Sequence, residues 1–266
     1  MKRIFFCGKE YNWWPTGEKS GPCGPDTEMF YWIGEGEPEG KPNEDSRWVE
    51  IWNDVFMQYN KKEDGTLEEL PQKNVDTGMG LERTLAVLNG KKSNYETDLF
   101  EPIINAIRKN GEFENRIERI IADHLRAAVF LIIDGVRPDN KLQGYVLRRL
   151  IRRSAVMIVH HHINIELNWR AFTTDLVNAV FDIYEEFYNL EENSKGTVIQ
   201  VIVSEVDKFG KTLRKGLHEV KKIDLIDGKK AFDLYQTYGF PYEVTEELFR
   251  QKGQEIDREQ FREEFE

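Results

Sequence analysis

The amino-acid sequence changes its pattern near Asn89-Gly90, and this change leaves few folds open. Before that point the strongest signals are extended segments. After it, apolar residues recur at the three-to-four-residue spacing of helices. This division predicts an α+β protein, in which residues 1–90 form an antiparallel β-sheet domain and residues 91–266 form an all-helical domain. A chain of 266 residues is long enough for both.

The clearest strand is predicted at Arg47 to Tyr59, whose odd positions would form one face that is apolar except for Asn53. A lone amide on such a face needs a hydrogen-bonding partner from the protein or from a ligand. A turn at Asp64-Gly65 and a second extended segment up to Asp76 follow. In the rest of this domain, strand signals are found at Arg3 to Phe6 and Thr27 to Trp32, and a solvated loop is expected at Gly34 to Ser46.

Beyond Gly90 the sequence predicts a succession of amphipathic helices. One apolar stripe, from Ile117 to Ile132, includes His124, which we interpret as a hydrogen-bonded core histidine. A second stripe of Phe209, Leu213, Leu217 and Val220 should be buried. The other helices are expected near residues 97–109, 142–159, 171–189, 197–222, 229–238 and 243–252.

Composition favours a folded protein without a membrane span, because 39% of the residues are hydrophobic but no apolar run reaches the length of a span. Two cysteines, Cys7 and Cys23, cannot build a disulfide framework, so the reducing cytoplasm is the expected compartment. The net charge of −11 argues against nucleic acid as a partner. The run Arg148 to Arg153, Arg-Arg-Leu-Ile-Arg-Arg, is a local exception.

Two segments rich in glycine could carry chemistry. In the first, Asn12 to Pro25, dense glycine and proline predict a stiff loop, beside which Trp14 could form the wall of a pocket. Loops of this composition are common, so a surface loop held by buried tryptophans is the alternative.

The second segment, Asn74 to Arg83, ends an extended stretch and opens a helix from Gly80 to Leu88. Gly78 and Gly80 would let the backbone approach a ligand closely, and a helix N-terminus favours an anion. Arg83 could then reach a phosphate, and Asp76 could bind a substrate ammonium. The alternative is a simple strand-to-helix turn with a capping Asp or Thr.

A third candidate is the helix near residues 142–159. At 100° per residue, Tyr145, Arg148, Arg149, Arg152 and Arg153 fall within one arc of roughly 140°, and apolar residues fill the opposite arc. Four guanidiniums around a tyrosine would suit RNA phosphates. The alternative is a charged face that pairs with nearby acids. A run of charges that are all positive, in a chain that is acidic overall, favours RNA contact.

Taken in order, these segments resemble alanyl-tRNA synthetases, which are class II enzymes. The resemblance covers almost the whole chain. It rests on Asn12-Trp13-Trp14, Thr16-Gly17, Gly21-Pro22-Cys23-Gly24-Pro25, Glu50-Ile51-Trp52-Asn53, Val75 to Arg83, Ile121-Ala122-Asp123-His124, Asp134-Gly135-Val136, Gly144 to Arg149 and Tyr238-Gly239-Phe240-Pro241.

The resemblance implies roles for particular residues. Gly78 to Arg83 resembles class II motif 3, whose arginine, here Arg83, holds ATP phosphates, and Gly80 lies within it. Asp76, which would bind the α-ammonium of alanine, and Arg83 would be the catalytic residues. The alanine pocket would be lined by Trp14, Asn53, Val55, Asp76 and Gly78. Asn140 and Glu243 resemble the residues that inspect the G·U wobble pair of tRNA(Ala), and the acceptor phosphates would be held by Tyr145, Arg148, Arg149, Arg152 and Arg153.

The implied reaction is ATP-dependent activation of alanine and its transfer to the 3′ end of tRNA(Ala), with Mg²⁺ as the metal. Class II motifs 1 and 2, which normally precede motif 3, are not found in this sequence. We therefore expect either that a separate N-terminal polypeptide supplies them or that the chain is a non-catalytic module that binds the acceptor stem. No set of metal ligands stands out, and the Glu50 side chain is expected to point away from the Asn53 face.

Overall fold

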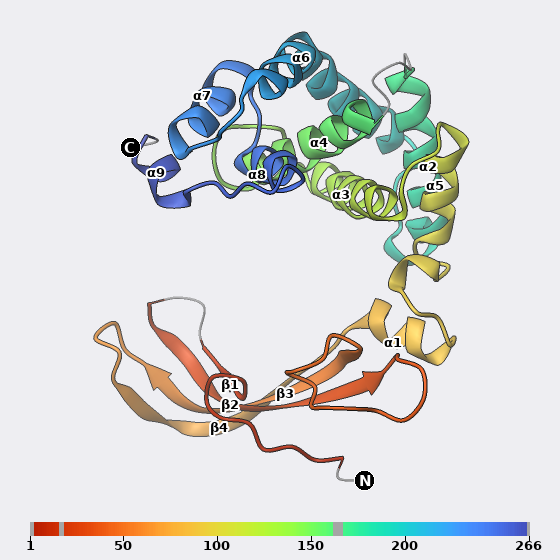
Figure 1. The fold of residues 1–266 in the computed structure, drawn as a ribbon. Coiled ribbons are helices and arrows are strands. Elements are labelled where there is room, and N and C mark those ends of the chain that lie inside the picture. Colours follow the sequence, from red (N-terminus) through yellow and green to blue (C-terminus); the bar gives the residue numbers. More distant parts are fainter. Residues whose placement is uncertain (1–2, 16–18, 162–166, 265–266) are drawn as a thin grey trace. The chain divides into compact units, whose positions relative to one another are not determined.

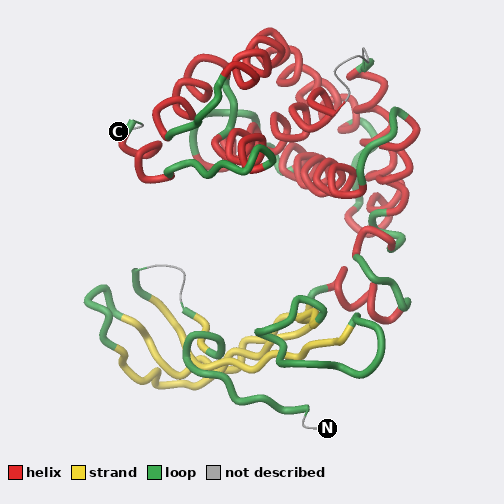
Figure 2. Tube along the Cα trace, viewed as in Figure 1, coloured by secondary structure: helices red, strands yellow, loops and turns green. Residues whose placement is uncertain are grey.

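The computed structural model describes residues 3–15, 19–161 and 167–264, so Thr16 and Gly17 of the first loop lie outside the described residues. The chain divides into two compact units, Met1–Leu99 and Phe100–Glu266. The strands lie in the first unit, and the second is helical (Figures 1 and 2), which confirms the α+β class. The boundary between the two units lies later in the chain than the predicted change at Asn89-Gly90. The reason is that the 3-10 turn η1 (Asn94–Glu96) contacts α1 (Leu81–Leu88), which belongs to the sheet unit.

The first unit is built on a four-stranded antiparallel sheet with the strand order β1-β2-β3-β4. The strands are β1 (Trp13–Trp14), β2 (Gly21–Trp32), β3 (Trp48–Lys61) and β4 (Leu67–Met79). The predicted turn between β3 and β4 is confirmed: Gly65 has a φ of +84°, and Asp64 Oδ1 accepts a hydrogen bond from Thr66 N at 2.9 Å.

Two expectations about which residues of the first unit form strands are wrong. Residues 3–6 form no strand, although they are apolar, because the edge strand of the described sheet at that end is β1. The second half of the expected loop, Gly21 to Pro25, is part of β2. It is extended because Gly24 lets the two strands approach: a Cβ at Gly24 would lie 1.8 Å from Phe56 O.

An irregularity in strand pairing changes which side chains share a face of β3. Met29 pairs with Trp52 but Phe30 pairs with Glu50, so Ile51 is an extra residue on β3. An extra residue reverses the alternation of side chains beyond it. Glu50 therefore lies on the same face as Asn53, and the expectation that it points away is wrong. Of the odd-numbered residues that were predicted to share one face between 49 and 59, those in the middle of the strand, Asn53, Val55 and Met57, do so.

The first unit has a small core. Its buried apolar side chains among the described residues are Cys23, Val55, Met57 and Ala86. The sheet face opposite Asn53, which we call the back face, carries Met29, Tyr31, Phe56, Val75 and Met79, all of them exposed. Exposed apolar groups gathered on one surface are typical of a surface that another polypeptide covers.

The second unit consists of helices that follow the predicted stripes. They are α2 (Glu101–Lys109), α3 (Asn115–Ile133), α4 (Leu142–His161), α5 (Trp169–Tyr188), α6 (Ser194–Lys222), α7 (Gly228–Tyr238), α8 (Tyr242–Arg250) and α9 (Arg258–Glu263). Each predicted helix is present, and the predicted stripe of α6 is buried. Within the described part of the chain, no helix is long and apolar enough to cross a membrane.

Candidate functional site

One face of the sheet carries most of the residues expected to bind alanine and ATP. Residues directly opposite each other in antiparallel strands share a face. Val55 pairs with Asp26 on β2 and with Asp76 on β4. Asn53 pairs in the same way with Glu28 and Gly78. We call this surface the acidic face; its residues are Asp26, Glu28, Glu50, Asn53, Val55, Asp76 and Gly78.

The lone amide of Asn53 has its partner in Glu50. Asn53 Nδ2 donates to Glu50 Oε1 at 3.2 Å. Gly78 lies beside the same amide, because a Cβ at Gly78 would be 3.4 Å from Asn53 Oδ1. The missing side chain therefore leaves a small space next to a fixed hydrogen-bonding group. Such a space is suited to a small polar substrate.

Glu50 also connects Asn53 to the helix that follows β4. Arg83, in the first turn of α1, donates through Nη1 to Glu50 O at 3.1 Å and lies 3.3 Å from Glu50 Oε2. Gly80 is the N-cap of this helix, and no side chain caps it. The alternative of a turn capped by Asp or Thr therefore does not describe the structure. The free N–H groups of α1 and the half-exposed Arg83 side chain provide donors for an anion.

Three carboxyl groups of the acidic face, those of Asp26, Glu28 and Glu50, influence one another. Burial raises the pKa of Asp26, and the charge of Glu50 raises it further, against a hydrogen bond from Asn12. Burial also raises the pKa of Glu28, as do the neighbouring charges of Glu50 and Asp26. Carboxylates that raise one another's pKa lie where a cation would be attracted. A hollow of about 1090 Å³ borders Asn12, Asp26 and Glu28.

Trp14 lies at the edge of the same surface. It pairs with Gly24, which is two residues from Asp26 on β2, and its side chain is exposed. Asp76 borders a shallow hollow of about 580 Å³ together with Met57 and Asn74. Asp76 and Arg83 thus belong to a solvent-exposed sheet surface with its adjoining helix rather than to the lining of a closed pocket, and Trp14 lies on the edge strand of the same sheet. Among residues 3–15, 19–161 and 167–264, no group of three or more His, Cys, Asp and Glu residues could hold a metal ion.

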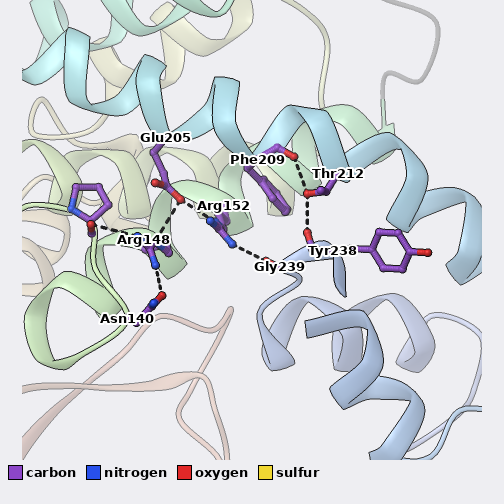
Figure 3. Close-up of polar contacts among 9 residues, drawn as sticks. Asn140, Arg148, Arg152, Glu205, Phe209, Thr212, Tyr238 and Gly239 are labelled. Carbon is purple, nitrogen blue, oxygen red and sulfur yellow. Dashed lines mark hydrogen bonds and ion pairs between the residues drawn. The ribbon is translucent and has the colours of Figure 1, made fainter. Parts of the chain in front are cut away.

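In the second unit, α4 does not present the free basic face that the sequence predicts. Its arginines are partly buried and pair with an acid of α6 (Figure 3) and with acids of α8. Glu205, which is 3% exposed, accepts from Arg152 Nε at 2.7 Å and lies 3.4 Å from Arg148 Nε. Glu247, which is 2% exposed, accepts from Arg153 Nη2 at 3.0 Å. The cause is that both faces of α4 are packed, so its cations neutralise buried carboxylates.

These arginines also hold two loops (Figure 3). Arg148 donates to Asn140 Oδ1 and, at 3.2 Å, to Pro138 O. Arg152 Nη1 donates to Gly239 O at 3.1 Å, and its guanidinium lies 4.9 Å from the centre of the Phe209 ring. Thr212 Oγ1 on α6 donates to Tyr238 O at 2.8 Å. The loop that carries Asn140 and the α7–α8 turn are therefore both fixed to α4 and α6.

Glu243, at the start of α8, is linked to α4 by Arg149. Arg149 Nη1 donates to Glu243 Oε1 at 2.7 Å and lies over the Tyr145 ring. Burial and the charge of Glu243 raise the pKa of Tyr145. The other oxygen, Glu243 Oε2, is buried and has no hydrogen-bond partner within the described segments. The Glu243 side chain as a whole is 28% exposed, so part of it faces solvent next to Arg149.

The interpretation of His124 as a hydrogen-bonded histidine is confirmed. Its Nε2 accepts from Arg153 Nη1 at 3.1 Å, which requires the ring proton on Nδ1, 3.0 Å from Asp123 Oδ2. Glu50 was expected on the opposite face of the sheet, and the buried partners of the α4 arginines, Glu205 and Glu247, were not predicted from the sequence. No local signal identifies Glu205 or Glu247, because a buried Glu in a helix has the same neighbours in sequence as a solvated one.

Comparisons with known proteins show the family to which the chain belongs. The family model described as tRNA synthetases class II (A) matches residues 1–266. An alanine–tRNA ligase of Borreliella afzelii (strain PKo) is 45% identical over 282 residues, which cover 99% of this chain and 46% of that protein. One of Legionella pneumophila (strain Corby) is 42% identical over 273 residues, with 98% and 31% covered. The chain thus spans less than half of the length of these relatives.

Proposed function

Because this chain belongs to the alanyl-tRNA synthetase family of class II enzymes, we propose that it is part of an alanine–tRNA ligase. In this proposal the acidic face and the start of α1 bind alanine and ATP, and the helical unit binds the acceptor stem of tRNA(Ala). The observation that carries it is the register of the sheet, which brings Asp76, Asn53 and Gly78 onto one face beside Arg83.

The acidic face supplies the recognition that alanine needs. Asp76 is exposed and would accept hydrogen bonds from the α-ammonium. Val55 lies opposite Asp76 and would contact the methyl group, while the space beside Gly78 would leave room for the α-carbon next to Asn53. Trp14 would close the outer edge. A pocket that selects a methyl group mainly by size rejects an added hydroxyl only about 10²-fold, so serine is the expected competitor.

The first chemical step would join the alanine carboxylate to the α-phosphorus of ATP. A carboxylate oxygen attacks, the bond to the bridging oxygen breaks, and pyrophosphate leaves with its electron pair. In the second step the terminal ribose hydroxyl of the tRNA attacks the alanyl carbonyl, loses its proton, and AMP leaves. The chain's contribution is positioning and charge: Arg83 and the first-turn N–H groups of α1 would hold phosphate oxygens, and Asp76 would orient the amino acid. Gly80, whose own N–H donates to Ile51 O at 3.0 Å, would contribute by letting the ligand approach the backbone closely.

Mg²⁺ would bind at this face together with ATP rather than at a site formed by the protein alone. It commonly takes one or two protein carboxylates together with substrate phosphates, and it would neutralise phosphate charge. Glu28 and Glu50, both on the acidic face, are the carboxylates that suit this role, since each lies among like charges.

The helical unit would recognise the acceptor stem through Asn140 and Glu243. Asn140 is exposed and is held by Arg148, and Glu243 is held by Arg149. A guanine amine in the wide minor groove of A-form RNA is a donor, and the partly exposed carboxylate of Glu243 is a suitable acceptor. The α4 residues of this region would serve mainly by fixing these two residues beside the acceptor stem; they are Tyr145, Arg148, Arg149, Arg152 and Arg153.

The back face would be covered by further polypeptide of the catalytic core. Its exposed Met29, Phe56, Val75 and Met79 leave apolar area in water that a packed partner would bury. We propose that this partner carries class II motifs 1 and 2, and a separate N-terminal polypeptide is one form that it could take.

ATP–pyrophosphate exchange with alanine tests the proposal. The chain is assayed alone and after mixing with a polypeptide that carries motifs 1 and 2. We expect exchange in the mixture, loss of at least about 10²-fold in Asp76→Asn, and normal exchange in Glu69→Gln, an exposed acid on the same strand. Binding of an acceptor-stem hairpin without exchange in any mixture would instead support a non-catalytic RNA-binding module.

A further inference from the structure

The C-terminal half of α6 has a charge opposite to that of the whole chain. Residues 208–222 contain six Lys and Arg residues and a single acid, Glu219, although the chain carries a net charge of −11. The cations are Lys208, Lys211, Arg214, Lys215, Lys221 and Lys222. So strong a local excess of positive charge in an acidic protein needs an explanation.

All six cations lie on one side of the helix. At 100° per residue they fall, together with His218, within an arc of roughly 140°. The opposite side packs into the core through the buried Phe209, Leu213, Leu217 and Val220. All six are exposed, and the segment is about 21 Å long. We call this surface the basic face of α6.

The basic face is not neutralised from within. In the part of the chain that the structure describes, one ion pair involves these cations, between Lys222 and Glu219 at 2.7 Å. Lys208, Lys211, Arg214, Lys215 and Lys221 have no carboxylate within ion-pair distance there. The arginines of α4 differ in this respect, because each of them is paired with an acid.

A hollow runs along the basic face. It has a volume of about 870 Å³ and is bordered on one side by Lys211, Arg214, His218 and Lys221. Asn110, Trp169 and one acid, Asp207, also line it, together with apolar side chains that include Leu213 and Leu217. A concave surface with one row of cations and a polar and aromatic wall matches a strand of linked phosphates better than it matches a flat protein surface.

We propose that the basic face of α6 is the surface along which the RNA phosphate backbone lies. This rests on the proposed function in taking RNA as the partner. When unpaired, solvated cations bind phosphates, they release the counterions of the RNA, which favours binding, and no ion pair within the protein has to be broken. If an α4 arginine turned to a phosphate, the buried Glu205 or Glu247 would keep only one of its two arginine partners, which is unfavourable. The α6 cations therefore supply the salt-dependent part of RNA affinity.

The test measures binding of a fluorescent acceptor-stem RNA hairpin to the 266-residue chain by anisotropy at several NaCl concentrations. The variant K211Q/R214Q/K221Q removes three cations that border the hollow. The matched control, K73Q/K91Q/K229Q, removes three exposed lysines from other parts of the chain. Both variants lose the same net charge, and circular dichroism confirms that both stay folded.

We expect the α6 variant to bind the hairpin about 10-fold or more weakly near 0.1 M salt, with the slope of log K against log salt reduced by about 2 to 3. The control should stay within about 3-fold of the unmodified chain. Equal affinities and slopes for the two variants would overturn the assignment of α6 while the chain's RNA binding stands. If the unmodified chain does not bind the hairpin even at low salt, RNA itself is the wrong partner, and the proposed function fails on that point.

Discussion

At the scale of single residues, Glu50 links the two halves of the candidate site. One of its carboxylate oxygens accepts from Asn53, and the other lies 3.3 Å from Arg83. Its charge also raises the pKa of Asp26 and of Glu28. One extra residue in β3, Ile51, makes this possible, because without it Glu50 would point to the back face. A local backbone irregularity thus determines the electrostatics of the whole surface.

Gly78→Ala tests the space beside Asn53. The new Cβ would lie 3.4 Å from Asn53 Oδ1, which is ordinary contact, so the fold should tolerate it. The methyl group would nevertheless occupy the volume expected for substrate. In the active assembly we expect alanine-dependent exchange to fall by at least about 10²-fold, with the melting temperature unchanged within a few degrees.

The control for this change is Gly196→Ala in α6, where an added Cβ meets nothing within 4 Å. It should leave exchange unchanged and stabilise the helix slightly, by up to about 1 kcal/mol. Normal exchange in Gly78→Ala would show that alanine does not bind next to Asn53.

At the scale of elements, α4 is a structural helix whose arginines connect α6 and α8. Glu205 is buried and depends on Arg152 and Arg148 for its charge balance. In Arg152→Ala, Glu205 keeps only the more distant arginine. We expect the free energy of unfolding of the helical unit to fall by about 3 kcal/mol or more, measured by urea denaturation.

The comparison is Lys208→Ala, an exposed cation on α6 with no acid within ion-pair distance among the described residues. It should leave stability within about 0.5 kcal/mol of the unmodified chain. Should Arg152→Ala keep its full stability and lose RNA affinity instead, α4 would be a direct RNA-binding helix after all.

The junction of α3, α4 and α8 gives the helical unit an acid-sensitive contact. Burial alone would raise the pKa of Glu247, but hydrogen bonds from Arg116 and Arg153 outweigh it and lower the pKa. A carboxyl with a lowered folded-state pKa contributes stability above its unfolded pKa of about 4.3, and this is lost as pH falls through the folded value.

Urea denaturation between pH 7 and pH 3 measures this contribution. The unmodified chain should lose stability below about pH 4.3, and Glu247→Gln should be less stable at pH 7 but lose less over the same range. Glu246→Gln, on the same helix, is the control. Parallel pH curves for Glu247→Gln and the unmodified chain would exclude Glu247 as a source of acid sensitivity.

At the scale of the whole molecule, the two units differ in how much core each possesses. The helical unit buries many large side chains, among them Phe172, Phe181, Phe209, Phe240 and Phe249. The sheet unit buries few and exposes the apolar back face. Since buried apolar area is the main source of stability, the sheet unit should be the weaker of the two.

Calorimetry of the intact chain should therefore show two transitions, with the sheet unit melting first. A partner that covers the back face should raise the temperature of the first transition and leave the second unchanged. Intrinsic fluorescence assigns the first transition, because the sheet unit contains Trp13, Trp14, Trp32, Trp48 and Trp52. A single transition that includes both units would mean that they are thermodynamically coupled.

The sequence by itself determined the α+β division, the β3–β4 hairpin, the helices and the buried stripe of α6. It could do so because periodicity and turn residues are local signals. The order of its motifs also indicated the family, and the comparisons confirm it.

Only the tertiary structure decided which charges meet. The spacing of the α4 arginines correctly places them on one side of a helix, but spacing within one helix contains no information about what packs there. Their partners, Glu205, Glu243 and Glu247, come from helices more than 50 residues away in the chain. Likewise, alternation along β3 could not reveal the extra residue that turns Glu50 toward Asn53. Pairing across strands and helices is a property of the packed chain, because each partner's position depends on every contact that holds its own element.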